Sequence, residues 1–468
     1  MVSTSQVERG VGRTLVVLSG APFLASLDLF VVNVAFTAIG RDFRGHTLAD
    51  LSWILNGYPI IYAALLVPCG RWADRVGHKR VFLLGLTLFT LASAAAAASP
   101  NLATLIACRL VQAAGAAALT PTSLGLLIHA VPTEQRARSV RIWASIGALA
   151  SSLGPVVGGF LVEFSWRWVF LINMPIGIAL LLLGIRVIRD YRAEDSQPAL
   201  NIVGAALLTV GIGALALGLV EGSVWGWTSA GILGSLALAA LALTAFAANN
   251  KRHRSPIIPP SLLKVRSFAW STIAVTFFSA TFGAGLLSRV FWLQDVWGYS
   301  AIRTGLAIAP GPLMVPVFAM VGQALAKRVS PGVIAATGCL LWAAGTLYML
   351  LAVGPESHYV SEMLPAWLIT GVGVGLALPT MLSCATAELP PARSGTGSAV
   401  VNMARQVGTV FGIALLVAIL GSPTGYDQQH RAFTNVFWMV TVIGVIAAVA
   451  SLGLTQRPPR KAAARLAA

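Results

Sequence analysis

The chain alternates long apolar runs with short polar breaks from one end to the other. Fourteen runs approach or exceed the roughly 20 residues that an α-helix needs to cross the hydrocarbon core of a bilayer. They cover residues 14–39, 51–69, 81–98, 102–129, 139–162, 168–188, 201–220, 231–248, 268–293, 304–326, 333–353, 362–385, 396–420 and 433–454. No run shows the alternation typical of a β-strand. The pattern therefore predicts an all-α polytopic membrane protein, and an even number of crossings puts both termini on one side.

The spacing of the runs predicts six helices, an inserted pair and six more helices. The boundaries we expect are an N-terminal six-helix bundle over 1–192, an inserted two-helix hairpin over 193–255, and a C-terminal six-helix bundle with a basic tail over 256–468. The basic stretch 70–80 has a weaker counterpart at 322–330, in the corresponding break of the second bundle. Paired bundles of this kind are typical of secondary transporters, whose binding sites lie near the bilayer midplane.

Composition agrees with this pattern, because 57% of the residues are hydrophobic and only 10% are charged. The net charge of +16 raises the question of nucleic-acid binding. Most Lys and Arg residues, however, fall in alternate breaks and in the two terminal segments, so the positive charge sets the orientation in the membrane. It predicts that both termini are cytoplasmic and that no nucleic acid is bound.

Several function classes are excluded by what the sequence lacks. The four cysteines lie in or beside apolar runs, and the six histidines show no metal-ligand spacing, so we expect neither a disulfide framework nor a metal. No lysine follows a glycine as in a phosphate-binding loop, which argues against ATP as the energy source. We find no constellation of nucleophile and base. We therefore expect no enzyme and no cofactor.

Five stretches resemble motifs of one membrane-protein family. They are "LDLFVVNVA" from Leu27, "GRWADRVGHKR" at 70–80, "RLVQAAGAA" from Arg109, "GALASSLGPVVGG" at 147–159 and "SWRWVFLINMPIG" from Ser165. Together, each in the expected span, they resemble the major facilitator superfamily, specifically its fourteen-span drug:proton antiporter branch of multidrug efflux transporters. The resemblance implies two six-helix bundles that rock around a midplane cavity.

The resemblance assigns two structural motifs. A cytoplasmic gate between spans 2 and 3 comprises Gly70, Asp74, Arg75, Gly77, Lys79 and Arg80, and an antiporter motif in span 5 comprises Gly147, Gly154, Pro155, Gly158 and Gly159. In the gate, Asp74 can pair with arginines and helix N-termini to form a clasp between bundle ends. The alternative is that the basic residues only enforce orientation. We expect both, because charge bias alone explains neither Asp74 nor the glycines.

Ionisable groups at bilayer depth cost about 2.5–3.5 kcal/mol each on insertion scales, so each is a candidate for function. Asp28, Arg109, Arg289 and Arg405 lie within the apolar runs. At 1.5 Å per residue, Asp28 lies about 16 Å and Arg109 about 10 Å from the same membrane face. We therefore expect these two residues to interact.

We hypothesise that Asp28 is the proton-coupling carboxylate and that Arg109 tunes it. Burial favours the neutral acid and a nearby arginine favours the carboxylate, so a change of exposure can switch Asp28 between binding and releasing a proton. The alternative is a fixed ion pair that only locks the bundle. Coupling is favoured because Asp28 is the one carboxylate at this depth in the sequence.

The substrate cavity is expected to include six polar side chains: Asp28, Asn33, Gln112, Asn402, Arg405 and Gln406. Asp28 as an anionic anchor favours lipophilic cations or neutral drugs, although Arg405 can equally attract an anion. Arg405 can also serve only to bond neighbouring helices. Arg289 is expected near the outer face, where its long side chain reaches the interface.

The resulting prediction is proton-coupled export of small, lipophilic cationic or neutral compounds across the cytoplasmic membrane. The partners we expect are the small-molecule substrate, protons and the lipid bilayer, with the protein acting as a monomer. A proton-coupled uptake symporter or a specific metabolite exporter would share the fold and the carboxylate, but the span 5 motif argues against uptake. A non-transporting receptor or scaffold would not need Asp28.

Overall fold

The protein was analysed as a computed structural model, which describes residues 4–190, 201–389, 391–421 and 425–454. Within these ranges the secondary structure is helical and contains no strand. Fourteen segments are long and apolar enough to cross a membrane, which confirms the predicted fold class. The predicted boundary between residues 192 and 193 and the basic C-terminal tail lie outside the described residues.

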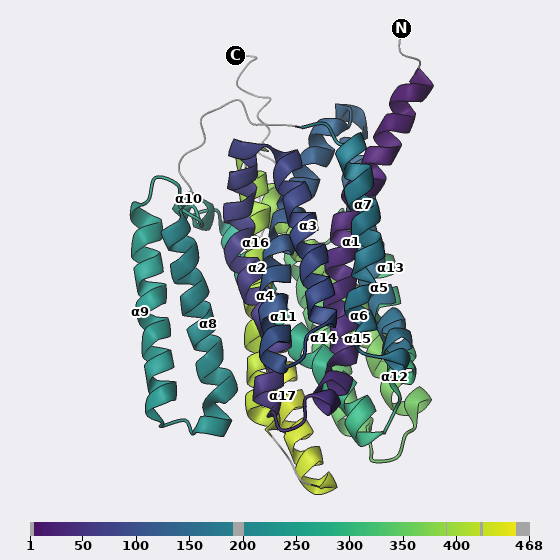
Figure 1. Cartoon of the computed structure of the whole chain (residues 1–468). Helices are drawn as coiled ribbons and strands as arrows, with labels where there is room; N and C mark the ends of the chain where they lie inside the picture. Colours follow the sequence, from purple (N-terminus) through teal and green to yellow (C-terminus); the bar gives the residue numbers. More distant parts are fainter. Residues whose placement is uncertain (1–3, 191–200, 390, 422–424, 455–468) are drawn as a thin grey trace, which may run out of the picture.

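The helices follow one another along the chain as two groups of six spans separated by a pair (Figure 1). The first group contains α1 (Thr4–Asp42), α2 (Leu48–Val76), α3 (His78–Ala97), α4 (Leu102–Ala130), α5 (Thr133–Phe164), and a span formed by α6 (Trp168–Leu171) and α7 (Asn173–Val187). The pair is α8 (Ile202–Trp225) and α9 (Ala230–Arg252), followed by the short α10 (Pro260–Leu263). The second group contains α11 (Arg266–Phe291) with η1 (Trp292–Val296), α12 (Ala301–Ile308) with α13 (Pro310–Leu325), α14 (Pro331–Ala352), α15 (Tyr359–Ala387), α16 (Pro391–Leu420) and α17 (Tyr426–Ser451).

Polar caps begin several of the spans where the chain re-enters the apolar layer. Thr47 accepts a hydrogen bond from the backbone N–H of Asp50, whose carboxylate accepts one from the backbone N–H of Thr47. This capping box satisfies two N–H groups that a helix start otherwise leaves free. Asn101, Ser229 and Ser330 cap α4, α9 and α14 through their side-chain oxygens. The short breaks in the sequence are therefore turns that position successive spans side by side.

The two groups repeat one packing detail. A Cβ on Gly85 of α3 would lie 2.9 Å from the carbonyl oxygen of Gly115 on α4, so these helices touch through their backbones. Gly338 of α14 has the same relation to Gly373 of α15, at 2.6 Å. Close backbone contact at small residues is a common way for helices to associate in membranes. The correspondence relates α3 and α4 to α14 and α15.

The two bundles touch at the end opposite to the one that holds Thr4 and Ser451, which we call the distal end. A Cβ on Gly159 of α5 would lie 2.5 Å from the carbonyl oxygen of Ala301 on α12. A Cβ on Gly305 of α12 would lie 2.2 Å from the carbonyl oxygen of Pro155. The rings of Phe36 and Phe291 lie 5.4 Å apart across α1 and α11. The bundles are therefore closed against each other in this region.

The helix pair α8 and α9 lies outside the two bundles, at the left of Figure 1, where α8 packs against both α2 and α16. Near the distal end, the indole N–H of Trp53 donates to Glu221 of α8 over 3.4 Å. Near the other end, Arg71 of α2 donates to the Ser255 hydroxyl and, over 2.7 Å, to the Pro256 carbonyl oxygen in the segment after α9. The pair is therefore attached to α2 at both of its ends.

Candidate functional site

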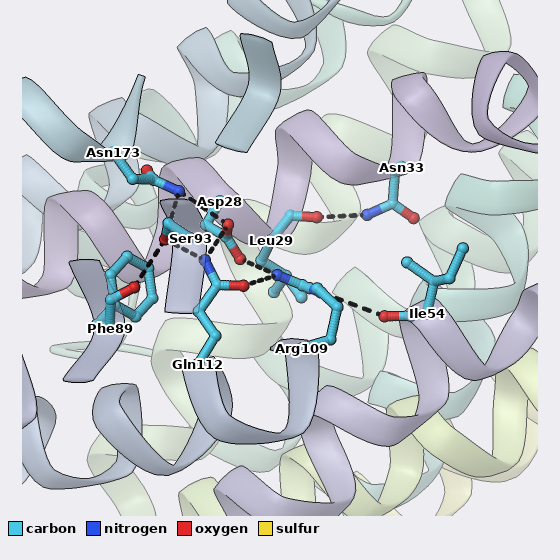
Figure 2. Close-up of polar contacts among 9 residues, drawn as sticks. All are labelled: Asp28, Leu29, Asn33, Ile54, Phe89, Ser93, Arg109, Gln112 and Asn173. Carbon is cyan, nitrogen blue, oxygen red and sulfur yellow. Dashed lines mark hydrogen bonds and ion pairs between the residues drawn. The ribbon is translucent and has the colours of Figure 1, made fainter. Parts of the chain in front are cut away.

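A buried ion pair lies in the middle of the N-terminal bundle (Figure 2). Arg109 of α4 donates from Nη1 to Oδ2 of Asp28 on α1 over 2.5 Å, and both side chains are 0% exposed. The expected proximity of the two residues is thus present in the structure. Because mid-membrane charges are costly unless paired, the short contact explains how both are accommodated.

A shell of neutral donors completes the coordination of the carboxylate. Gln112 donates from Nε2 to Asp28 Oδ1 over 2.7 Å and accepts from Arg109 Nη1 over 2.6 Å. Asn173 of α7 donates to the same Asp28 oxygen over 3.0 Å. Ser93 of α3 accepts from Gln112 over 2.8 Å. Side chains from α1, α3, α4 and α7 therefore converge on one proton-accepting group (Figure 2).

The guanidinium of Arg109 has further contacts that do not depend on the carboxylate. Its carbon lies 4.4 Å from the centre of the Tyr58 ring, and its Nε donates to the Ile54 carbonyl oxygen over 3.4 Å. Its Nη2 is buried without a hydrogen-bond partner. If a proton neutralised Asp28, Arg109 would keep Gln112, Ile54 and the aromatic face of Tyr58. The position of the Arg109 guanidinium therefore does not depend on the carboxylate alone.

Sequence reasoning missed three members of this site. Asn173, Ser93 and Tyr58 were not singled out, although Asn173 lies in the stretch "SWRWVFLINMPIG". A polar amide within an apolar run is a signal that could have identified Asn173. A serine or a tyrosine in a membrane helix is too common to carry such a signal. Only the fold shows that they face Asp28 and Arg109.

The other expected cavity residues are placed in different surroundings. Asn33 donates to the Leu29 carbonyl oxygen of its own helix over 2.7 Å, and Asn402 donates to Ser398 in the same way over 2.9 Å. Gln406 is 5% exposed, whereas Arg405 is partly exposed. Gln112 belongs to the Asp28 site. The structure thus gathers Asp28, Arg109 and Gln112 and leaves Asn402, Arg405 and Gln406 together on α16.

Arg289 corrects an expectation, because it does not reach the membrane interface. Its side chain is 0% exposed, and it donates to the Gly285 carbonyl oxygen over 2.8 Å and to the Thr346 hydroxyl over 2.9 Å. Its guanidinium carbon lies 4.9 Å and 5.0 Å from the ring centres of Trp342 and Trp367. The indole faces and the hydroxyl provide a buried environment for the cation, so it has no need to extend to water.

The gate stretch 70–80 forms the tight connection between α2 and α3. Asp74 contacts His78 Nε2 over 2.9 Å. The carboxylate at the start of α3 is that of Asp190, which accepts from the backbone N–H of Lys79 over 3.2 Å. Lys79 also donates from Nζ to the Ile185 carbonyl oxygen over 2.9 Å. The sequence indicated an acid at a helix N-terminus, but Asp190 takes that position.

Gly77 is the residue on which this connection depends. Its φ of 112° lies in the region that glycine tolerates and other residues avoid, and a Cβ there would lie 2.8 Å from the Asp190 carboxylate. We expect Gly77→Ala to destabilise the connection by about 1–2 kcal/mol and to slow transport, because the backbone conformation becomes strained. Thermal unfolding and transport rate measure the two effects. Gly12→Ala is the matched control, since no neighbouring atom lies within 4 Å of its Cβ position, and equal effects of both substitutions would contradict the prediction.

The span 5 motif packs in two directions. Gly147, Gly154 and Gly158 face α1, where a Cβ on Gly154 would lie 2.6 Å from that of Phe30. Pro155 and Gly159 instead approach α12 of the other bundle at the distal end. The expected bare helix face thus exists, and part of it forms the contact between the two bundles.

The sequence and the fold identify the class of protein. Residues 18–413 match the Major Facilitator Superfamily. The chain belongs to the major facilitator superfamily, and it is a multi-pass membrane transporter rather than an enzyme.

Relatives with known roles are similar over most of their length. The methylenomycin A resistance protein of Streptomyces coelicolor is 33% identical over 94% of this chain and 91% of its own. The cephamycin export protein of Amycolatopsis lactamdurans is 33% identical, covering 95% and 93%. The tetracenomycin C resistance and export protein of Streptomyces glaucescens is 30% identical, covering 88% and 76%. These relatives are resistance and export proteins.

Solved structures share the fold at low sequence identity. A POT family transporter in complex with 5-aminolevulinic acid has a TM-score of 0.70 and 16% identity, covering 96% of this chain and 97% of its own. An inward-facing bacterial homologue of the human lysosomal transporter Spinster has a TM-score of 0.68 and 15% identity, covering 96% and 99%. At such identities the similarity concerns the fold alone.

Proposed function

We propose that this protein exports small lipophilic compounds across the cytoplasmic membrane in exchange for protons, as a monomer with both termini in the cytoplasm. The observation that carries the proposal is the fully buried Asp28, held by Arg109, Gln112 and Asn173. A fully buried acid inside a transporter is a candidate proton site, because its charge is stable only while its partners surround it. A proton gradient can drive export without ATP, because a membrane potential of 100 mV supplies about 2.3 kcal/mol per charge moved.

The exchange of substrate for protons follows from competition between a proton and Arg109 for the Asp28 carboxylate. When Asp28 is charged, its pairing with Arg109 favours the closed site described above. A proton from outside neutralises the acid and weakens its contacts with Arg109, which favours rearrangement of α1 against α4. Release of that proton to the cytoplasm restores the pair. Alternating access then couples the entry of protons to the exit of substrate, with Asp28 as the group exposed in turn to each side of the membrane.

Two observations support export rather than uptake. The relatives are named for resistance to, or export of, antibiotics. The glycines of α5 permit the backbone contact with α12 that closes the distal end, which the charge pattern assigns to the outside. A proton-coupled uptake symporter would move the same substrates in the opposite direction.

Everted membrane vesicles energised by respiration provide the test. The compounds to add are those after which relatives are named: methylenomycin A, tetracenomycin C and puromycin. Proton release from the acidic lumen is followed with a pH-sensitive dye. We expect wild-type vesicles to release protons when a substrate enters, and Asp28→Asn to reduce the initial rate by about tenfold or more at equal expression. Asp42→Asn is the matched control, because Asp42 lies on the same helix but is half exposed.

The outcomes separate the candidate functions. An Asp28→Asn protein with wild-type proton release would remove Asp28 from the mechanism. Substrate leaving the vesicles, rather than entering them, would identify an uptake symporter. Vesicles that move none of the compounds and release no protons would favour a non-transporting protein.

A further inference from the structure

The charges inside the helices are not balanced. Asp28 and Arg109 neutralise each other, whereas neither Arg289 nor Arg405 has a carboxylate within ion-pair distance in the described part of the chain. Arg289 is enclosed by the hydroxyl and indole groups of its own bundle. Arg405 differs, because it is partly exposed between the buried residues Ala404 and Gln406. It is therefore the cation in this part of the molecule that a ligand can reach.

Two tyrosines of α2 extend from the proton site toward Arg405. The Tyr58 ring lies against Arg109 and stacks on Tyr62, with ring centres 6.2 Å apart and planes inclined by 12°. Arg405 lies on α16, which packs directly against α2, and it is near enough for its charge to act on the Tyr62 hydroxyl. The Tyr62 hydroxyl donates to Thr120 over 3.0 Å, so its position is fixed. The two rings, 2% and 6% exposed, therefore form an interior aromatic pair beside the cation.

The tyrosine pair also includes a hydroxyl group that a ligand can bind. Tyr58 is only 2% exposed, and its buried hydroxyl has no hydrogen-bond partner. A buried hydroxyl without a partner is unfavourable, and an acceptor oxygen of a ligand would relieve it. On the lipid side, α8 covers the contact between α2 and α16. The arrangement therefore favours a ligand from the interior of the protein over a lipid.

We propose, on the basis of the export function above, that Tyr58, Tyr62 and Arg405 form a subsite for aromatic compounds that carry a carboxylate or another oxyanion. Asp28 is not available as an anchor for a cation, because Arg109, Gln112 and Asn173 already surround it. A cationic ligand would be repelled by Arg405, while an anion gains a charge-assisted hydrogen bond and can lie beside the tyrosine pair.

A matched pair of probes tests the charge preference. Fluorescein and rhodamine 123 share a xanthene ring system, but the first is anionic and the second cationic at pH 7.5. Their binding to the purified full-length protein in detergent is followed by fluorescence anisotropy. We expect fluorescein to bind at least about tenfold more tightly than rhodamine 123, since a hydrogen bond to a charged group contributes roughly this factor.

Substitutions locate the effect. Arg405→Gln should weaken fluorescein binding by about tenfold or more without weakening rhodamine 123 binding, while Arg405→Lys should retain most of the affinity. Arg303→Gln is the control for net charge, because Arg303 is exposed on α12. Absence of fluorescein binding to the wild type, equal affinity for both probes, or equal effects of Arg405→Gln and Arg303→Gln would each overturn the proposal.

The subsite and the export function fail in different ways. We expect Asp28→Asn to lose proton-driven transport while it still binds fluorescein. If Arg405→Gln leaves binding unchanged but Asp28→Asn abolishes transport, the subsite is wrong and the proton mechanism stands. If the Asp28→Asn protein still exchanges protons while Arg405→Gln abolishes fluorescein binding, the proton mechanism is wrong and the subsite stands.

Discussion

We expect Arg109→Met to destabilise the protein by about 3–5 kcal/mol, and the addition of Asp28→Asn to restore more than half of the loss. Removing one partner of a buried pair leaves the other charge uncompensated, which is the expensive case. In the single variant, Asp28 keeps only the neutral donors Gln112 and Asn173. In the double variant no charge remains at the site. Thermal unfolding of the purified proteins in detergent measures both steps.

The same pair of variants distinguishes coupling from a fixed ion pair. If Asp28 carries the proton, the double variant is stable but does not transport against a gradient. If the pair only locks the bundle, the double variant regains proton-driven transport along with its stability. An Arg109→Met protein that unfolds at the wild-type temperature would show that the contact with Asp28 does not hold α1 to α4.

Gly412→Ala is expected to cost about 3 kcal/mol or more, because the methyl group has no space to occupy. The Cβ position at Gly412 of α16 lies 1.9 Å from the carbonyl oxygen of Ala280 on α11, and that at Gly408 lies 2.1 Å from the carbonyl oxygen of Thr276. Backbone atoms cannot rotate away as a side chain can, so the helices must separate. Reduced yield of folded protein and a lower unfolding temperature are the measurements.

The control for this substitution is Gly213→Ala on α8, where no neighbouring atom lies within 4 Å of the Cβ position. It should leave stability unchanged or raise it, since alanine favours a helix more than glycine does. If Gly412→Ala unfolds like Gly213→Ala, α11 and α16 do not approach each other so closely.

The spans could be predicted from the sequence because membrane crossing is a local property, set by the length and polarity of each run. The pairing of Asp28 with Arg109 followed from their similar depths, since few charges are available in the membrane. The environment of Arg289 could not be predicted in this way. Its position relative to Trp342, Thr346 and Trp367 depends on how α11, α14 and α15 pack, which depth alone does not specify.

The helices that the glycines contact could not be predicted from the sequence either. The span 5 glycines were recognisable as a bare helix face, but their division between α1 and α12 depends on the arrangement of the bundles. Gly408 and Gly412 make closer contacts than any residue of that motif, yet their spacing resembles that of many glycines in the chain. Asp190 was missed for a similar reason, because it approaches Gly77 from 113 residues further along the chain.

The attachment of α8 across α2 and α16 has a consequence for how the protein faces the lipid. The two bundles adjoin along two lines, one where α2 meets α16 and one where α5 meets α12. Here the helix pair covers the line where α2 meets α16, and hydrogen bonds of Trp53 and Arg71 hold the pair to α2 at opposite ends. The helix pair lies away from the line beside α5 and α12, which makes the protein asymmetric toward the lipid although its halves are alike.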